Sequence, residues 1–317
     1  MKYSVAVLTS LLHLAASQID LTNWILELPV KADPLNPNNT EVATILNPQL
    51  NAVPRFSNEF FYTTPASDGQ VFHTPVFPPN GQPQSGTPFV STFLRESDPN
   101  STFVHWDSTK GTHSLKADLA VTTFPGTTNA KMIVAEIKVN SNICVGCTSF
   151  ALFAHAKSNP ITYYLKGVFG NFTTTVDIDP AYQLGAKFNI EILVVEGVIY
   201  FYYNNELKSP EGGFKSTEQS VYYKAGAFSQ NQNSVLHPAA AVNEVVFYSL
   251  AVTHNESTTP PQLPPPATTS VVSSEPTASA TADAGKGAAS PSTTAAATKS
   301  SSVVLSLFLA AVGFALM

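Results

Sequence analysis

Short apolar runs, interrupted repeatedly by Gly, Pro, Asn and Asp, fill the chain from about Asp20 to His254. Apolar residues at helical spacing are almost absent from this region, whereas alternation of apolar and polar residues recurs. Phe188–Val195 and Val198–Tyr203 flank Glu196-Gly197, which predicts a hairpin whose glycine supplies a positive φ angle. Short strands separated by turn residues at regular intervals indicate an all-β sandwich or barrel.

The N-terminal residues predict a processing signal. Lys2 is followed by an apolar run that ends at Ala15-Ala16-Ser17, and a basic start, a hydrophobic segment and a small-residue cleavage site are typical of a secretory signal peptide. We therefore expect residues 1–17 to be removed and residues 18–255 to form the folded domain. Residues 256–302 are rich in Ser, Thr, Pro and Ala, so they cannot bury enough apolar surface to fold and predict a disordered stalk.

A second apolar stretch, residues 303–317, ends the chain. Small residues and a polar spacer precede it, which is the pattern of a GPI-attachment signal whose hydrophobic tail is removed. The alternative, a single C-terminal membrane helix, fits less well because the stretch is short and lacks a basic cytoplasmic stop. We expect a secreted monomer at the cell surface or wall, in contact with the membrane only through a lipid anchor.

Composition limits which binding partners and which kinds of metal or redox site the chain can have. The net charge of -6 argues against nucleic acid, which needs a basic face. Cys144 and Cys147 are the two cysteines, and in an oxidising compartment they predict a local disulfide more than a zinc or redox centre. With a signal peptide, the Asn-x-Ser/Thr sequons predict surface glycosylation. The asparagines of these sequons are Asn38, Asn100, Asn171 and Asn255.

Three segments divide into an apolar face and a face with polar and aromatic side chains, since alternate residues of a strand share a face. The polar faces contain, segment by segment, Met132, Val134, Glu136 and Lys138; Tyr222, Lys224, Gly226, Phe228 and Gln230; and Ser91, Phe93 and Arg95. The face of residues 132–139 that we expect in the core contains Ile133, Ala135, Ile137 and Val139. Ordinary amphipathic strands are one interpretation. A carbohydrate-binding surface is the other, because rings stack on sugars and basic groups pair with carboxylates.

The same segments carry a family resemblance. Tyr222-Tyr-Lys-Ala-Gly-Ala-Phe-Ser-Gln230 is similar to the YFKAGxYxQ signature of the alginate lyases of polysaccharide lyase family seven. Ser91-Thr-Phe-Leu-Arg95 aligns with that family's R(S/T)ELR strand, and Glu136-Ile-Lys138 with its Q(I/V)H strand. The resemblance covers nearly all of residues 20–254. It implies a jelly-roll β-sandwich with a concave substrate groove, and β-elimination on a uronate polysaccharide of the alginate or glucuronan type without metal or other cofactor.

Five positions of the polar faces depart from the family pattern. Ser91 replaces an Arg, Phe93 a Glu, Glu136 a Gln, Lys138 a His, and Phe228 the Tyr that usually donates the proton. One hypothesis is a lyase with a rearranged catalytic set. In that set Lys138 is the base, with its pKa lowered by neighbouring cations, and Tyr222 is the acid. The catalytic set is Lys138, Glu136, Arg95 and Tyr222, and the substrate-binding set is Lys224, Gln230, Ser91, Phe228 and His73. His73 is included because it lies near the groove end of its strand, and an ordinary surface or loop histidine is the alternative.

Two alternatives stay open. A domain with this groove could bind an anionic or wall polysaccharide without cleaving it, and the Glu136–Lys138 pair could be an ordinary surface ion pair of small energetic value. A glycoside hydrolase, with Glu136 as its acid, needs a second carboxylate at a suitable distance. The three polar faces supply none, so this class ranks last.

Overall fold

The described part of the chain, in a computed structural model, comprises residues 19–32, 41–77, 90–127, 129–140, 142–144, 146–157, 160–231 and 241–255. The predicted signal peptide, stalk, GPI-attachment region and hydrophobic tail lie outside it, and so does Asn38. The chain divides into two compact units, residues 1–268 and 269–317, and every described residue belongs to the first. Within the described ranges, no helix is long and apolar enough to span a bilayer.

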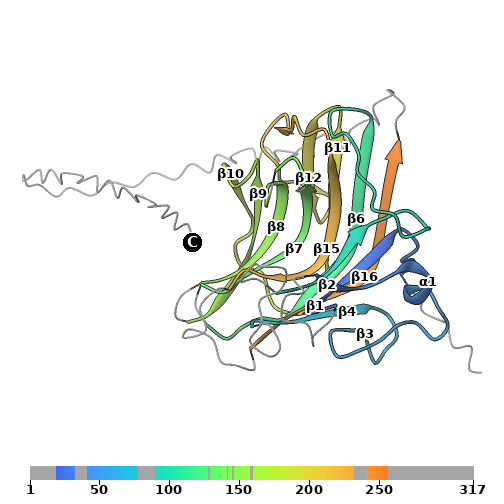
Figure 1. Cartoon of the computed structure of the whole chain (residues 1–317). Helices are drawn as coiled ribbons and strands as arrows, with labels where there is room; N and C mark the ends of the chain where they lie inside the picture. Colours follow the sequence, from blue (N-terminus) through green and yellow to red (C-terminus); the bar gives the residue numbers. More distant parts are fainter. Residues whose placement is uncertain are drawn as a thin grey trace, which may run out of the picture. The chain divides into compact units, whose positions relative to one another are not determined.

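Two antiparallel sheets make up this domain (Figure 1). Sheet A contains, in spatial order, β10 (Thr174–Asp179), β9 (Thr162–Phe169), β8 (Thr148–Lys157), β7 (Lys131–Val139), β15 (Val221–Ser229), β5 (Ser91–Glu96), β1 (Trp24–Lys31) and β2 (Val42–Ile45). Sheet B contains β13 (Glu206–Leu207), β12 (Val198–Tyr203), β11 (Phe188–Val195), β6 (Thr112–Thr123), β16 (Val242–Asn255), β4 (Gln70–Pro75) and β3 (Phe61–Thr63), and β14 (Phe214–Lys215) pairs with β12. The described helix, α1, is a single turn at Asn47–Leu50.

The core lies between the two sheets, where most strands contribute alternate side chains. Phe150 of β8 and Phe201 of β12 meet there with ring centroids 4.9 Å apart. The hydroxyl of Tyr223, on β15, donates to the carbonyl of Ile192 on β11 over 3.3 Å. Full burial of one large apolar side chain stabilises the fold by about 1.5–3 kcal/mol. The predicted all-β sandwich is therefore confirmed.

The predicted hairpin is also confirmed. β11 pairs with β12 from Ile190↔Tyr203 to Val195↔Val198, and both turn residues have positive φ, 47° at Glu196 and 82° at Gly197. The strands of sheet A curve along their length (Figure 1). The face of sheet A that points away from the core carries the predicted polar side chains.

Candidate functional site

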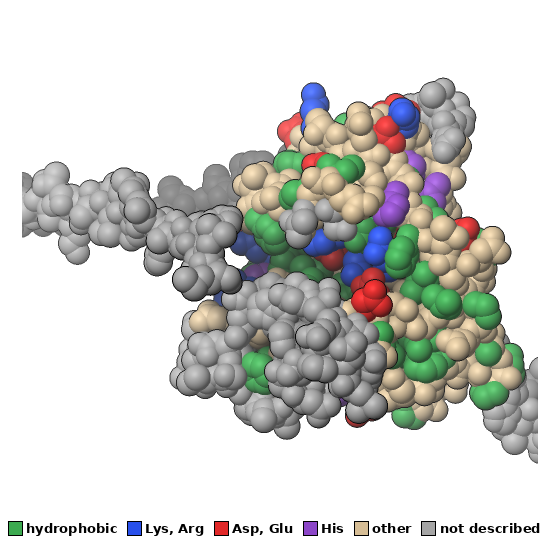
Figure 2. All heavy atoms as spheres, in the orientation of Figure 1, with side chains coloured by type: hydrophobic (Ala, Val, Ile, Leu, Met, Phe, Trp, Pro, Cys, Tyr) green, Lys and Arg blue, Asp and Glu red, His purple; other side chains and the backbone are tan. Residues whose placement is uncertain are grey.

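Strand pairing brings the predicted catalytic residues together on the outer face of sheet A. Lys224 of β15 pairs with Arg95 of β5 on one side and with Glu136 of β7 on the other. Two residues earlier on β15, Tyr222 pairs with Lys138. Because paired residues of adjacent strands point to the same face, these five side chains form one patch. Figure 2 shows basic, acidic and histidine side chains gathered in a hollow near the middle of the domain.

The predicted faces are confirmed for β5 and β15 but not for all of β7. The pairing of β7 with β8 shifts between Ile133 and Ala135, so that Val134 and Ala135 both pack in the core. Ile133 instead lies in a small apolar cluster on the outer face, and Met132 lies in the core. The prediction for Met132, Ile133 and Val134 was wrong because a bulge reverses the alternation of a strand. The residues after the bulge keep their predicted faces.

Gly226, the glycine of the Lys-Ala-Gly motif, is required by the close approach of β5. A Cβ atom at this position would lie 2.4 Å from the carbonyl oxygen of Thr92 and 2.9 Å from the Cα atom of Phe93. Its φ of 148° is also one that residues with a side chain rarely adopt. The motif therefore sets the spacing of the two strands that carry Lys224 and Arg95.

Glu27 on β1 is a member of the patch that sequence reasoning missed. Its Oε2 accepts a hydrogen bond of 2.6 Å from Lys224 Nζ, and its Oε1 lies 4.0 Å from Arg95 Nη1. Burial alone would lower the pKa of Lys224, but Glu27 and other groups of the patch raise it above its usual value. The charge of Lys224 is therefore compensated within the protein, and Arg95 is the cation better placed for a ligand.

Arg95 lies between two aromatic rings and beside a histidine. Its guanidinium carbon is 3.7 Å from the ring centroid of Phe103 and 4.3 Å from that of Tyr222. Its Nη2 is 3.3 Å from Nε2 of His105, whose ring meets Tyr222 edge to face at 5.5 Å. Arg95 Nε is buried without a partner among the described residues. Phe103 and His105 were not predicted, because they lie in a loop where no alternation marks a face.

Glu136 and Lys138 occupy the other side of the patch, around Thr148 of β8. Lys138 Nζ donates to the carbonyl oxygen of Gly146 over 3.1 Å and to Thr148 Oγ1 over 3.2 Å, and it lies 4.0 Å from Glu136 Oε2. Thr148 Oγ1 donates to Glu136 Oε2 over 3.2 Å. Glu136 is only 1% exposed, and its Oε1 has no partner among the described residues. A buried carboxylate oxygen without a donor can accept a hydrogen bond from a ligand.

Tyr222 can supply a proton, whereas the position of the family's usual donor cannot. Burial raises the pKa of the Tyr222 phenol, and the nearby cations oppose this only in part, so the hydroxyl keeps its proton. Phe228 packs against Phe93 with ring centroids 5.9 Å apart and pairs with Ser91. Gln230 lies just beyond β15, about 20 Å along the strand direction from Lys224. Ser91, Phe228 and Gln230 therefore line a more distant part of the same face.

His73 lies on the other sheet, contrary to its predicted place in the groove. β4 belongs to sheet B, and its neighbouring side chains, Phe72 and Thr74, are buried. Because side chains alternate, His73 points outward from sheet B, where its Nδ1 lies 3.3 Å from Glu244 Oε2. The prediction was wrong because it rested on the position of His73 along its strand, and the sequence does not show which sheet that strand joins.

The cysteines and the described sequons lie at the surface of the domain. Cys144 and Cys147 are paired in the turn between β7 and β8, with their Cα atoms 5.5 Å apart. This turn includes the carbonyl group that accepts a hydrogen bond from the lysine of β7. Asn100, Asn171 and Asn255 are all exposed, as glycan attachment requires.

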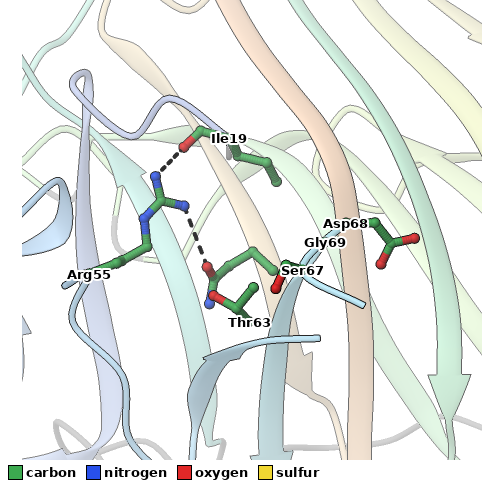
Figure 3. Close-up of a pocket in the computed structure, with 7 residues that line it drawn as sticks. Ile19, Arg55, Thr63, Ser67, Asp68 and Gly69 are labelled. Atoms are coloured by element: carbon green, nitrogen blue, oxygen red, sulfur yellow. Dashed lines mark hydrogen bonds between the residues drawn. The ribbon is translucent and has the colours of Figure 1, made fainter. Parts of the chain in front are cut away.

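A small pocket at the edge of sheet B is separate from the patch (Figure 3). Arg55 fills one side of it and donates to the carbonyl oxygen of Ile19 over 2.5 Å and to Gln70 Oε1 over 3.5 Å. These contacts fasten the start of the domain to β4, so the pocket has a structural role.

Comparisons with known proteins place this geometry in context. A family model described as alginate lyase matches residues 19–254. The alginate lyase AlgAT5 of polysaccharide lyase family 7 is 25% identical, with a TM-score of 0.61 over 76% of this chain and 98% of its own. An alginate lyase from a Corynebacterium species is 24% identical, with a TM-score of 0.61 over 76% and 98%. One from Pseudomonas aeruginosa is 21% identical, with a TM-score of 0.58 over 74% and 100%. A search of curated protein sequences gave no match.

Proposed function

The chain belongs to the alginate lyase family, and from this premise we propose that its domain cleaves a uronate-containing polysaccharide by β-elimination. One observation carries the proposal. The guanidinium of Arg95 stacks at 4.3 Å on the ring of Tyr222, so a cation and a protonated phenol share one patch. β-Elimination needs a cation that neutralises the uronate carboxylate and an acid that protonates the leaving oxygen.

The reaction balances without an added reactant. Arg95 pairs with the carboxylate, which makes the adjacent C5 proton more acidic. A base takes this proton, the electron pair forms a double bond between C4 and C5, and the bond from C4 to the glycosidic oxygen breaks. The Tyr222 hydroxyl then protonates the leaving oxygen. Oε1 of Glu136, which has no partner among the described residues, is proposed to accept a hydrogen bond from a sugar hydroxyl.

Production of the unsaturated product tests the proposal. The purified full-length protein would be incubated with alginate, glucuronan and oligouronates while the ultraviolet absorbance of the C4=C5 product is followed. A steady increase on at least one of these substrates is expected. No increase on any uronate, together with retained binding in affinity electrophoresis, would reject the lyase.

A polysaccharide-binding domain without turnover is the second candidate, because Lys138 and Phe228 hold two positions where the family has its His and Tyr. Restoring three of the family residues together, as Glu136→Gln, Lys138→His and Phe228→Tyr, distinguishes the two candidate functions. If the natural protein is a binder only, it produces no unsaturated product, whereas the triple variant gains activity. If the natural protein is a lyase, it is active before any change.

We also propose that the domain works outside the cell, anchored by a lipid and held away from the membrane by its stalk, as a monomer. The apolar run ending at Ala15-Ala16-Ser17, the tail at 303–317 and three exposed sequons support this proposal. Release from intact cells by a phosphatidylinositol-specific phospholipase is the expected result. Retention after that treatment, with release only by detergent, would favour a membrane helix.

A further inference from the structure

The proposed elimination needs a base close to Arg95, and the base predicted from the sequence is engaged elsewhere. The ammonium of Lys138 donates to two oxygen acceptors, Gly146 O and Thr148 Oγ1. A base must offer a free lone pair to the C5 proton. Two cations, Arg95 and Lys224, were expected to activate Lys138. Both of them contact Glu27 instead.

His105 is held beside Arg95 by backbone and side-chain contacts of the next residue. Trp106 and Val221 exchange two backbone hydrogen bonds, each 2.9 Å long, which tie the loop to the start of β15. The indole Nε1 of Trp106 also donates to the buried Glu96 over 3.0 Å. The loop that carries His105 is therefore fixed to both strands of the patch, next to Tyr222.

The contact with Arg95 identifies the nitrogen that bears the lone pair. A guanidinium can only donate hydrogen bonds, so His105 Nε2, 3.3 Å from Arg95 Nη2, must be the acceptor. In a uronate, the C5 proton is one carbon away from the carboxylate. When a uronate carboxylate takes over the hydrogen bond from Arg95, the Nε2 lone pair is freed, and the C5 proton of the same sugar comes next to it.

The charges around His105 favour its neutral form. Partial burial of the ring and the positive charge of Arg95 lower the pKa of His105, while Glu96 opposes this shift. Tyr222, which contacts the same ring, keeps its proton near neutral pH. At neutral pH the patch thus contains an unprotonated imidazole and a protonated phenol.

We propose that His105 is the general base of the elimination, with Nε2 taking the C5 proton as Arg95 holds the carboxylate and Tyr222 protonates the leaving oxygen. This inference rests on the proposed lyase function. The imidazolium formed in each turnover returns its proton to solvent, and the phenolate regains one, so the site is restored. The base then comes from the loop after β5 and not from β7.

The variant His105→Gln tests the inference, because Gln keeps a polar side chain of similar reach but is not a base. We expect kcat to fall about 100- to 10,000-fold, with a much smaller change in KM. Added imidazole should restore part of the activity of His105→Ala, which a purely structural role would not allow. The acidic limb of the pH profile of kcat/KM should have its midpoint below 6.5 and disappear in His105→Gln.

Lys110→Ala is the matched control, since Lys110 ends the same loop with a side chain that is 79% exposed and paired with Asp107. It should retain the natural activity. An active natural protein with full turnover in His105→Gln would overturn the assignment of the base and leave the lyase intact. A natural protein that cleaves no uronate polymer would overturn both.

Discussion

Two carboxylates on opposite sheets differ in how many hydrogen-bond donors surround them. The carboxylate of Glu244, on sheet B, is surrounded by hydrogen-bond donors. Three are hydroxyl groups, those of Tyr62 at 2.9 Å, Thr122 at 2.7 Å and Thr123 at 3.4 Å, and the fourth is His73 Nδ1 at 3.3 Å. Glu136, on sheet A, has one hydroxyl donor at 3.2 Å and an ammonium at 4.0 Å. Its second oxygen has no partner among the described residues, although Glu136 is the more deeply buried of the two.

The difference indicates what each carboxylate is for. A buried polar atom without a partner costs about 1–3 kcal/mol, so a ligand that donated a hydrogen bond to Glu136 would recover that cost. Glu244 lies on β16 and stabilises its pairing with β4 and β6, because its donors come from β4, from β6 and from β3, which pairs with β4. Glu136 instead belongs to the patch, and its Oε1 has no partner among the described residues. A structural carboxylate and a functional carboxylate should therefore respond differently to substitution.

The largest expected effect is the loss of the acid on the functional side. Tyr222→Phe should lower kcat about 100- to 10,000-fold, because Phe cannot protonate the leaving oxygen, while the fold is retained. Tyr62→Phe is the matched control. It removes the same hydroxyl group from the Glu244 cluster and should leave kcat unchanged. Comparable losses of kcat in both variants, measured from the unsaturated product, would contradict the contrast.

Local patterns predicted much of the fold and part of the patch. Alternation is preserved in β5 and β15, so the faces of Arg95, Tyr222 and Lys224 could be derived from spacing alone. The bulge in β7 could not be derived from the sequence, because the extra residue at Val134 has no side chain that marks a bulge. Glu27 was missed for a different reason, since it reaches Lys224 across 197 positions and sits in an otherwise apolar segment.

Two histidines show the same limit. His73 was a candidate for the groove because it lies near one end of its strand, but pairing with β16 puts it on sheet B. His105 was not predicted, because loop residues have no periodicity and its place depends on the contacts of Trp106. Long-range pairing decides both positions, and a single sequence carries little information about it.

The second largest expected difference between the two carboxylates is in the free energy of unfolding. Glu244→Gln should lower the free energy of unfolding by about 1.5–3 kcal/mol, because it weakens hydrogen bonds to a charged acceptor. Glu136→Gln should change it by less than about 1 kcal/mol, since the substitution also removes a buried charge with an unpaired oxygen. Urea unfolding of both variants measures the difference. An equal loss would show that Glu136 is as structural as Glu244.

Affinity for the substrate should change when the carboxylate on sheet A is substituted, but not when the one on sheet B is. Glu136→Gln replaces a carboxylate, which repels a uronate, with an amide that can donate to one. We expect affinity for a polymer composed entirely of uronates to increase about tenfold, equivalent to one added hydrogen bond. Affinity electrophoresis in alginate gels measures the shift, with Glu244→Gln as the control that should not move. Unchanged affinity in Glu136→Gln would place its carboxylate outside the ligand's reach.

The smallest expected effect is the acid sensitivity due to Glu244. The hydrogen bond from His73 is the largest of the causes that lower the pKa of Glu244 from its ordinary 4.5 to about 2, and Thr122 and Tyr62 add to it. A carboxyl whose pKa is depressed in the folded state stabilises the protein above pH 4.5, and this contribution is lost as the pH falls toward 2. Because the group is partly exposed, we expect about 1 kcal/mol and not the roughly 3 kcal/mol that the shift alone implies. The stability difference between natural protein and Glu244→Gln should therefore shrink by about half of this amount (~0.5 kcal/mol) between pH 5 and pH 3. A difference that stays constant over this interval would mean that the surrounding donors do not favour the ionised form, and Glu244 would no longer serve as the saturated reference for Glu136.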